Sequence, residues 1–239
     1  MTFTTVLLFL QGCSGPQMET VRVGVDSTWY PIDFAEETSY VNGFIQELLL
    51  EISKESSLQF IQVTANSDSL YEGVQKGNYS TLISSLLPSD ETLSRYGFSD
   101  LLLPLGPVLI VPAFSSVRSL EEMHGQMVGT LLNDPALQLL IPYPTLQARP
   151  IYTSARELLS ALEKREIDGA LLSYIPAVQY VRDLFQGRLT IATPPLTPAG
   201  LRLITPKDDL VLFQFNKAFH RLQREGKWQA LLVQWGFSP

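Results

Sequence analysis

Residues 21–63 read VRVGVDSTWYPIDFAEETSYVNGFIQELLLEISKESSLQFIQV, and this stretch decides the fold. Residues 21–25 alternate enough to form a strand, residues 43–52 carry apolar side chains at helical spacing, and residues 58–63 are again strand-like. The order of strand, helix and strand predicts a β-α-β unit, in which the two strands lie parallel in one sheet.

The alternation continues beyond this unit toward residue 112. Residues 70–76 (LYEGVQK) have a helical pattern that ends at Gly77, a natural C-cap, and a buried strand is predicted at residues 81–87. Residues 108–112 (VLIVP) form an apolar strand that leads out of this first set. Repeated alternation of strand and helix predicts a sheet with helices on both faces.

A second alternating set follows along the chain. Residues 128–132, 150–152 and 168–173 are strand-like or extended. Residues 135–141 and 154–164 have helical patterns. The second set therefore predicts another α/β lobe, built like the first without visible sequence repetition.

The chain then turns back. The Pro-rich stretch TPPLTP at residues 193–198 predicts a change in the direction of the chain before a strand at residues 201–204. Two helices, at residues 209–225 and 227–235, end the chain. A chain that leaves one lobe and later returns crosses between the lobes twice, which makes a hinge.

We therefore predict an α/β fold of two lobes, each a mostly parallel sheet flanked by helices, with two hinge crossings. Lobe 1 would comprise residues 21–108 plus 197–239, and lobe 2 residues 109–196. The carboxyl ends of the strands of both lobes would face each other across a cleft. Open α/β sheets bind ligands at this position, so functional residues are expected in the loops there.

The composition narrows the class of protein. The chain has 239 residues, 45% of them hydrophobic and 17% charged, which suits a globular protein of this size and disfavours disorder. A net charge of −7 without a basic stripe disfavours nucleic acid as a partner. No stretch after the N-terminus has the roughly 18 consecutive apolar residues that would span a bilayer.

The N-terminus, residues 1–20, is expected to hold a targeting signal and a tether. Leu10-Gln11-Gly12-Cys13 follows a short apolar run and resembles the lipobox of bacterial lipoproteins, in which the thiol of the cysteine is acylated. Residues 14–20 would then link the membrane to the domain. The alternative is that Cys13, the only cysteine, is a buried free thiol in a short helix.

Short motifs follow one another in a fixed order between residues 21 and 237. They are VGVD at 23–26 with Trp29, GF at 43–44 with EL at 47–48, SS at 84–85, FSD at 98–100, SLE at 119–121, VG at 128–129, NKA at 216–218 and Trp235. Their order and spacing resemble the amino-acid type of bacterial periplasmic solute-binding proteins, family 3. The resemblance implies a type II periplasmic-binding-protein fold, a monomer in the periplasm that closes on a small polar ligand and docks on an ABC permease.

Five residues of lobe 1 are candidates for contact with a ligand. Trp29 offers a flat apolar wall, and Asp26 follows a strand, where its carboxylate would accept hydrogen bonds from a polar or cationic group. Ser84 and Ser85 interrupt an apolar strand, and their hydroxyls need partners. Leu70 matches the position of an apolar wall in the resembled family.

Each of these residues also has a purely structural interpretation. Trp29 and Leu70 would look the same as ordinary core residues. Asp26 would serve equally as a capping residue of a turn or helix. The hydroxyls of Ser84 and Ser85 would find partners in the neighbouring backbone.

The resemblance also implies residues that this chain lacks. Members that bind free α-amino acids hold the carboxylate with an arginine six residues before FSD and with backbone amides at a Gly-Thr pair, and hold the ammonium with an aspartate of lobe 2. The corresponding positions carry Thr92, Asn133 with Asp134, and Ser173. Ser89, in the same loop as Thr92, is a further candidate.

The altered positions bear on the ligand. Arg95 would take over the carboxylate if the loop is displaced by three residues, but a lone arginine in a polar loop is more often solvated. Asp134 would repel a carboxylate, although it also suits the start of a helix. Together Asp26, Trp29 and Asp134 favour a neutral or cationic ligand, such as a cationic amino acid, an amine or a short peptide.

Two other classes of function remain open at this point. A dehydratase-like enzyme on the same scaffold would need a general acid near an arginine, and the two histidines, His124 and His220, fall in a loop and in a C-terminal helix. A sensor without an importer is the other alternative. No cofactor or metal is expected, because the sequence has no Gly-rich phosphate loop and no Cys/His metal spacing.

Overall fold

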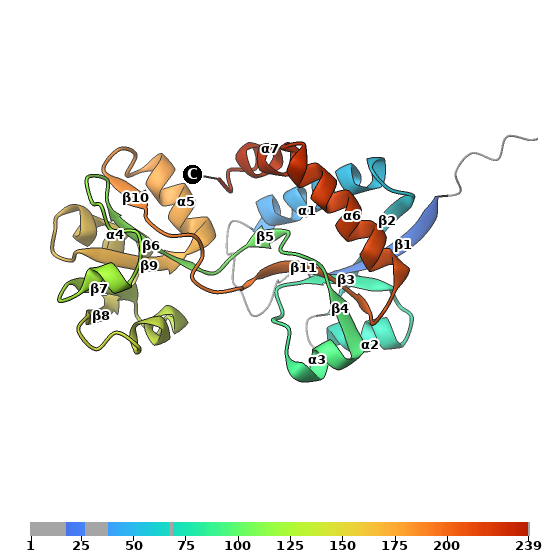
Figure 1. Cartoon of the computed structure of the whole chain (residues 1–239), viewed down its shortest axis with the longest axis horizontal. Helices are drawn as coiled ribbons and strands as arrows, with labels where there is room; N and C mark the ends of the chain where they lie inside the picture. Colours follow the sequence, from blue (N-terminus) through green and yellow to red (C-terminus); the bar gives the residue numbers. More distant parts are fainter. Residues whose placement is uncertain (1–17, 27–37, 67–68, 239) are drawn as a thin grey trace, which may run out of the picture.

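The computed structural model describes residues 18–26, 38–66 and 69–238. Its strands form two separate sheets, which lie side by side along the long axis of the molecule (Figure 1). The first sheet has the order β2-β1-β3-β11-β4, with β5 paired to β11, and the second has the order β10-β6-β9-β7-β8. The predicted two-lobed α/β class is thereby confirmed.

The first sheet begins with the predicted β-α-β unit. It contains β1 (Glu19–Asp26), β2 (Leu58–Ala65), β3 (Thr81–Ser84), β4 (Tyr96–Phe98), β5 (Leu103–Pro104) and β11 (Gly200–Pro206). Strand β1 is parallel to both β2 and β3, whereas β11 is antiparallel to β3, β4 and β5 because it enters the sheet from the second lobe. The sheet is therefore mixed rather than uniformly parallel.

Helices cover both faces of the first sheet. They are α1 (Thr38–Lys54), α6 (Leu210–Arg224) and α7 (Lys227–Gln234) on one face, and α2 (Leu70–Gln75) and α3 (Asp90–Arg95) on the other. The apolar residues of α1 recur at helical spacing, so Phe44, Leu48 and Ile52 are all fully buried against the sheet. This face holds the largest apolar cluster of the described chain.

The second sheet has the same mixed character. It contains β6 (Pro107–Pro112), β7 (Met127–Leu131), β8 (Gln147–Tyr152), β9 (Gly169–Ser173) and β10 (Leu189–Ile191), with α4 (Ala155–Glu163), α5 (Tyr174–Asp183) and the 3-10 helices η3 (Glu121–Met123) and η4 (Pro135–Leu140). Strand β7 is parallel to β8 and β9, and β6 is antiparallel to β9 and β10. The helix predicted at residues 135–141 is a 3-10 helix.

The two hinge crossings run side by side. One passes from β5 to β6 and the other from β10 to β11, and they exchange backbone hydrogen bonds from Leu105 N to Ala199 O (2.9 Å) and from Leu196 N to Pro107 O (2.8 Å). A Cβ at Gly106 would lie 2.5 Å from Thr197 Oγ1, so only glycine permits this approach. The predicted boundary between residues 108 and 109 falls inside β6, which begins at Pro107. The exact lobe boundaries stay a prediction.

The C-terminal tail adds a third link between the lobes. After α7 the chain runs toward α5 of the second lobe (Figure 1), where the Tyr174 hydroxyl donates to Phe237 O (3.1 Å) and Arg182 Nη1 donates to Gly236 O (3.1 Å). Ile175 of α5 joins the apolar cluster of the first lobe. The hinge is therefore flanked by a noncovalent contact that any movement of the lobes must accommodate.

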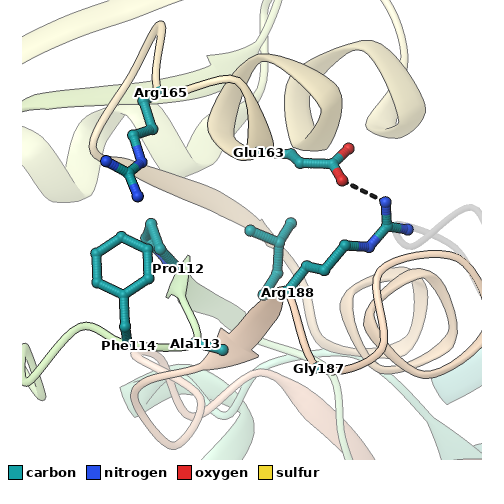
Figure 2. Close-up of a pocket in the computed structure, with 8 residues that line it drawn as sticks. Pro112, Ala113, Phe114, Glu163, Arg165, Gly187 and Arg188 are labelled. Atoms are coloured by element: carbon teal, nitrogen blue, oxygen red, sulfur yellow. Dashed lines mark hydrogen bonds and ion pairs between the residues drawn. The ribbon is translucent and has the colours of Figure 1, made fainter.

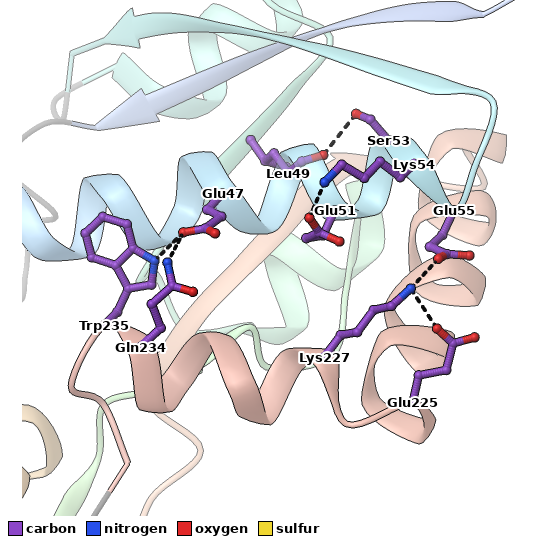
Figure 3. Close-up of polar contacts among 10 residues, drawn as sticks. All are labelled: Glu47, Leu49, Glu51, Ser53, Lys54, Glu55, Glu225, Lys227, Gln234 and Trp235. Atoms are coloured by element: carbon purple, nitrogen blue, oxygen red, sulfur yellow. Dashed lines mark hydrogen bonds and ion pairs between the residues drawn. The ribbon is translucent and has the colours of Figure 1, made fainter.

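Helix α7 is fastened to α1 by polar contacts along its length (Figure 3). Glu47 accepts hydrogen bonds from Trp235 Nε1 (2.8 Å) and Gln234 Nε2 (2.9 Å), and Lys227 pairs with Glu55 (2.7 Å). The Trp235 ring lies directly over Gly43 of α1, where a Cβ would overlap it. Gly43 is thus required by the close approach of an aromatic ring.

Replacement of Gly43 by alanine tests this packing. In an ordinary helix interior the change stabilises by about 1 kcal/mol, but here the ring must be displaced, and we expect a net loss of about 1–2 kcal/mol in the free energy of unfolding. In a Trp235→Ala background the ring is gone, so Gly43→Ala should become stabilising. Urea denaturation of the four proteins of this cycle measures the reversal, and equal effects in both backgrounds would contradict it.

Among the helices within the described ranges, none combines the length and the apolar character needed to cross a membrane. The predicted lipobox with Cys13 and the aromatic residue Trp29 lie outside the described residues.

Candidate ligand-binding site

The carboxyl ends of β1 and β3 bring Asp26 and Ser84 to the same edge of the first sheet. Val25 pairs with Ile83, so Asp26 lies beside Ser84 one residue further along. Both residues are buried, with exposed fractions of 1%. Burial, together with the charge of Asp26, raises the pKa of the Tyr79 hydroxyl. We call Asp26, Ser84 and Ser85 the first carboxyl edge.

Local hydrogen bonds occupy part of this edge. Ser84 Oγ accepts from Leu86 N (3.2 Å), which turns the chain and explains why the strand predicted at residues 81–87 ends at Ser84. Ser85 is buried beside it. The structural interpretation of Ser84 therefore explains the hydrogen bond that its hydroxyl accepts. It does not say which group accepts the proton that the hydroxyl can donate.

Leu70 lies in the apolar cluster beneath this edge rather than on a surface. It is 3% exposed, contacts the cluster that contains Ala65 and Leu82, and its carbonyl accepts from the Tyr79 hydroxyl (2.7 Å). These contacts are those of an ordinary core residue. A role of Leu70 as a wall of the ligand site stays a prediction.

Ser89 and Thr92 form the start of α3. Ser89 Oγ accepts from Thr92 N (3.3 Å), and Thr92 Oγ1 accepts from Ser89 N (2.8 Å), which is a capping box. The residue at the position of the family arginine thus serves the helix. Arg95 is exposed at the last residue of α3, where a cation suits the helix dipole.

The candidates of the second lobe also gather at one edge. Asn133 and Asp134 follow β7, and Ser173 ends β9, which is the parallel neighbour of β7. Asn133 adopts a left-handed conformation (φ 60°), and Asp134 accepts from Ala136 N (2.8 Å) as the cap of η4. Ser173 is exposed and makes no capping hydrogen bond through its side chain. We call these three residues the second carboxyl edge.

Both carboxyl edges adjoin the hinge. Ser84 pairs with Arg202, two residues beyond Gly200, where β11 leaves the crossing, and Ser173 pairs with Pro107, where β6 leaves the other crossing. Since each edge touches a crossing, the two edges lie on either side of the same hinge. This arrangement fits a ligand held between the lobes.

Arg202 is a residue of this region that the sequence reasoning missed. It lies in the middle of β11, opposite Ser84, and its Nη2 donates to Pro198 O (3.0 Å) in the returning crossing. Burial lowers the pKa of Arg202, and the nearby charge of Asp100 acts in the opposite direction. The signal was present in the strand GLRLITP, where a single arginine interrupts apolar residues.

The two histidines are exposed residues, and neither belongs to a carboxyl edge. His124 Nδ1 lies 3.0 Å from Thr145 Oγ1 in the second lobe. His220 Nε2 lies 2.5 Å from Asp100 Oδ2 on the surface of the first lobe. Each histidine is engaged with a surface partner, as a packing or solvated residue would be.

A hollow at the far end of the second lobe contains none of the candidate residues (Figure 2). Arg165 lies over the Phe114 ring there, 4.8 Å from its centroid, and Arg188 pairs with Glu163. All of its lining residues belong to the second lobe, near the end of β6, the end of α4 and the start of β10, whereas Ser173 pairs with the beginning of β6. The hollow is therefore separate from the two carboxyl edges.

The fold and the two edges define a two-lobed α/β binding protein with a hinge. The family of bacterial extracellular solute-binding proteins, family 3, matches residues 21–238. The chain therefore belongs to this family, and the family, fold and solute-binding function predicted from the sequence are confirmed.

Relatives and solved structures agree with this assignment. The chain is similar to the arginine-binding extracellular protein ArtP of Bacillus subtilis (22% identity, 89% of this chain, 84% of that protein). It is also similar to the lysine/arginine/ornithine-binding periplasmic protein of Escherichia coli (24%, 89% and 86%). The unliganded open L-cystine solute receptor of Neisseria gonorrhoeae shares its fold, with a TM-score of 0.70 at 19% identity over 90% of this chain and 92% of that chain. These relatives are binding proteins rather than enzymes.

Proposed function

We propose that this protein binds a small cationic amino acid between its lobes and delivers it to an ABC permease. The observation that carries the proposal is the buried carboxylate of Asp26 at the end of β1, beside the hinge. Beside the contacts that it already makes, a carboxylate at this edge can accept charge-assisted hydrogen bonds from a cationic group of the ligand. Two relatives support this choice by their names: one is an arginine-binding protein, and the other is a lysine/arginine/ornithine-binding protein.

The remaining parts of the proposal concern the surroundings of this site. Residues 21–108 with 197–239 form one lobe and residues 109–196 the other, and the closed form docks on the permease as a monomer. Trp29 stacks on the ligand, and the second carboxyl edge completes the site on closure. Cys13 is acylated and anchors the protein to the membrane on the periplasmic side, as its likeness to a lipobox suggests.

A thermal-shift panel tests the ligand class. The purified protein is heated with L-arginine, L-lysine, L-histidine, L-glutamine, L-glutamate or L-aspartate. A ligand that binds only the folded state adds about 2.7 kcal/mol of stability at 100 times its dissociation constant, so a cationic amino acid should raise the melting temperature. A shift with L-glutamate or L-aspartate and none with the cationic members would overturn the proposal.

A further inference from the structure

Arg202 occupies the same row of the first sheet as the proposed ligand contacts. It pairs with Ser84, and Asp26 lies beside Ser84 on the opposite neighbour, so the three residues come from the adjacent strands β11, β3 and β1. Directly paired residues point to the same face of a sheet. Ile204 and Leu82, two residues away from Arg202 and Ser84, lie in one cluster on that face. The guanidinium therefore shares the face of Asp26.

One end of this guanidinium is satisfied and the other is not. Nη2 donates to Pro198 O, whereas Nη1 is buried and has no hydrogen-bond partner within the described part of the chain. Asp100, whose charge acts to raise the pKa of Arg202, is itself in contact with His220 through Oδ2. A buried N–H of a charged group without an acceptor costs free energy, so the native state gains if an acceptor arrives.

The spacing suits a ligand with two charges. Neighbouring strands lie about 4.8 Å apart, so the backbones of Asp26 and Arg202, two strands apart, are separated by roughly 10 Å. The long arginine side chain can shorten this span from one side. A basic amino acid whose cationic end lies at Asp26 would extend its carboxylate toward Arg202.

The hydrogen bond to Pro198 also connects Arg202 to the hinge. Pro198 belongs to the crossing that returns from the second lobe, so one guanidinium joins the hinge backbone to the proposed ligand row. An acceptor bound at Nη1 would order the side chain and with it this crossing. The same group that recognises the ligand would then favour one arrangement of the hinge.

We infer that Arg202 binds the carboxylate of the ligand and replaces the arginine whose usual position carries Thr92. This inference rests on the proposed ligand-binding function and names the residue that recognises the carboxylate of the amino acid. The ligand carries a carboxylate as well as a cationic group, and a decarboxylated amine of the same shape binds more weakly. A guanidinium fork is suited to a carboxylate because it donates two parallel hydrogen bonds.

Matched pairs of ligands test the inference directly. Calorimetry on the full chain compares L-arginine with agmatine, L-lysine with cadaverine, and L-histidine with histamine, for the wild type, Arg202→Gln and Arg202→Lys. The wild type should bind the amino acid of at least one pair about 10- to 100-fold more tightly than its amine. Arg202→Gln should remove that preference, and Arg202→Lys should retain part of it because the charge remains without the fork.

Controls separate the possible failures. Arg224→Gln removes an exposed arginine of α6 and should leave both affinities unchanged. Circular dichroism and the melting temperature without ligand show whether each variant folds, and Arg202→Lys carries the test if Arg202→Gln does not. If the wild type binds an amino acid and the Arg202 variants keep its full preference, this inference is overturned and the proposed function stands. If the wild type binds no probe of any pair, both are overturned.

Discussion

Phe237→Ala is expected to lower the free energy of unfolding by about 3–5 kcal/mol, a large part of the stability of a typical domain. Phe237 is fully buried, packs edge-on against Phe44 with 5.5 Å between ring centroids, and its N–H donates to Leu232 O (2.7 Å). Alanine leaves a cavity between α1 and the C-terminal tail. The tail also carries the carbonyl that Tyr174 contacts, so loosening it weakens the link between the lobes.

The measurement is thermal or urea unfolding beside a matched control. A loss of 3–5 kcal/mol corresponds to a fall in melting temperature of about 6–20 °C for a chain of this size. Phe213→Ala on α6 removes the same ring from a position that is 69% exposed and should change stability by less than about 0.5 kcal/mol. Equal effects of the two substitutions would show that Phe237 is not part of the core.

Asp26→Asn should weaken the binding of a cationic amino acid by about 2–5 kcal/mol, which is a rise of 30-fold or more in Kd. The substitution keeps the shape of the side chain and removes its charge at the end of β1. Ligands without a cationic side chain, such as L-glutamine, should lose less. Calorimetry at low and at high salt measures the Kd of each ligand. The salt-dependent part of the affinity is the part that Asp26→Asn should reduce.

A second substitution guards against a general effect of charge. Asp208→Asn changes an exposed turn of the first lobe, where the backbone has a positive φ that asparagine tolerates well. Its affinity for L-arginine should match that of the wild type. If Asp26→Asn also binds L-arginine with unchanged affinity while folding normally, Asp26 does not contact the cationic group.

The first elements of the first lobe could be predicted from the sequence because the apolar periodicity that defines them is local. The strands at residues 21–25 and 58–63 and the helix between them follow directly from apolar periodicity, and they appear as β1, β2 and α1. The sequence did not yield α5, whose third residue is Pro176, or the short strands β4, β5 and β10. The expectation of a polar loop around Thr92 and Arg95 was wrong, because the capping box of Ser89 and Thr92 starts the short helix α3 there. Strands of two or three residues are defined by their partners in the sheet and carry too little pattern of their own.

The candidate site could be predicted only in part, because some of its residues are placed by strand register and not by a local pattern. The gathering of Asp26 with Ser84, and of Asp134 with Ser173, follows from the rule that parallel strands end at one edge. The position of Arg202 depends on the register of an antiparallel strand that returns from the other lobe, which no local pattern encodes. The same holds for Phe237, whose burial depends on the path of the tail toward α5.

Movement of the lobes on ligand binding is the central claim, and a distance between the lobes measures it most directly. Spin labels at Lys76 of the first lobe and Gln138 of the second, both exposed, are introduced as cysteines in a Cys13→Ser background. With saturating L-arginine, double electron–electron resonance should show the distribution of distances narrowing and shifting to shorter values, and Asp26→Asn should require far more ligand. An unchanged distribution in a protein that calorimetry shows to be fully bound would contradict closure around the hinge.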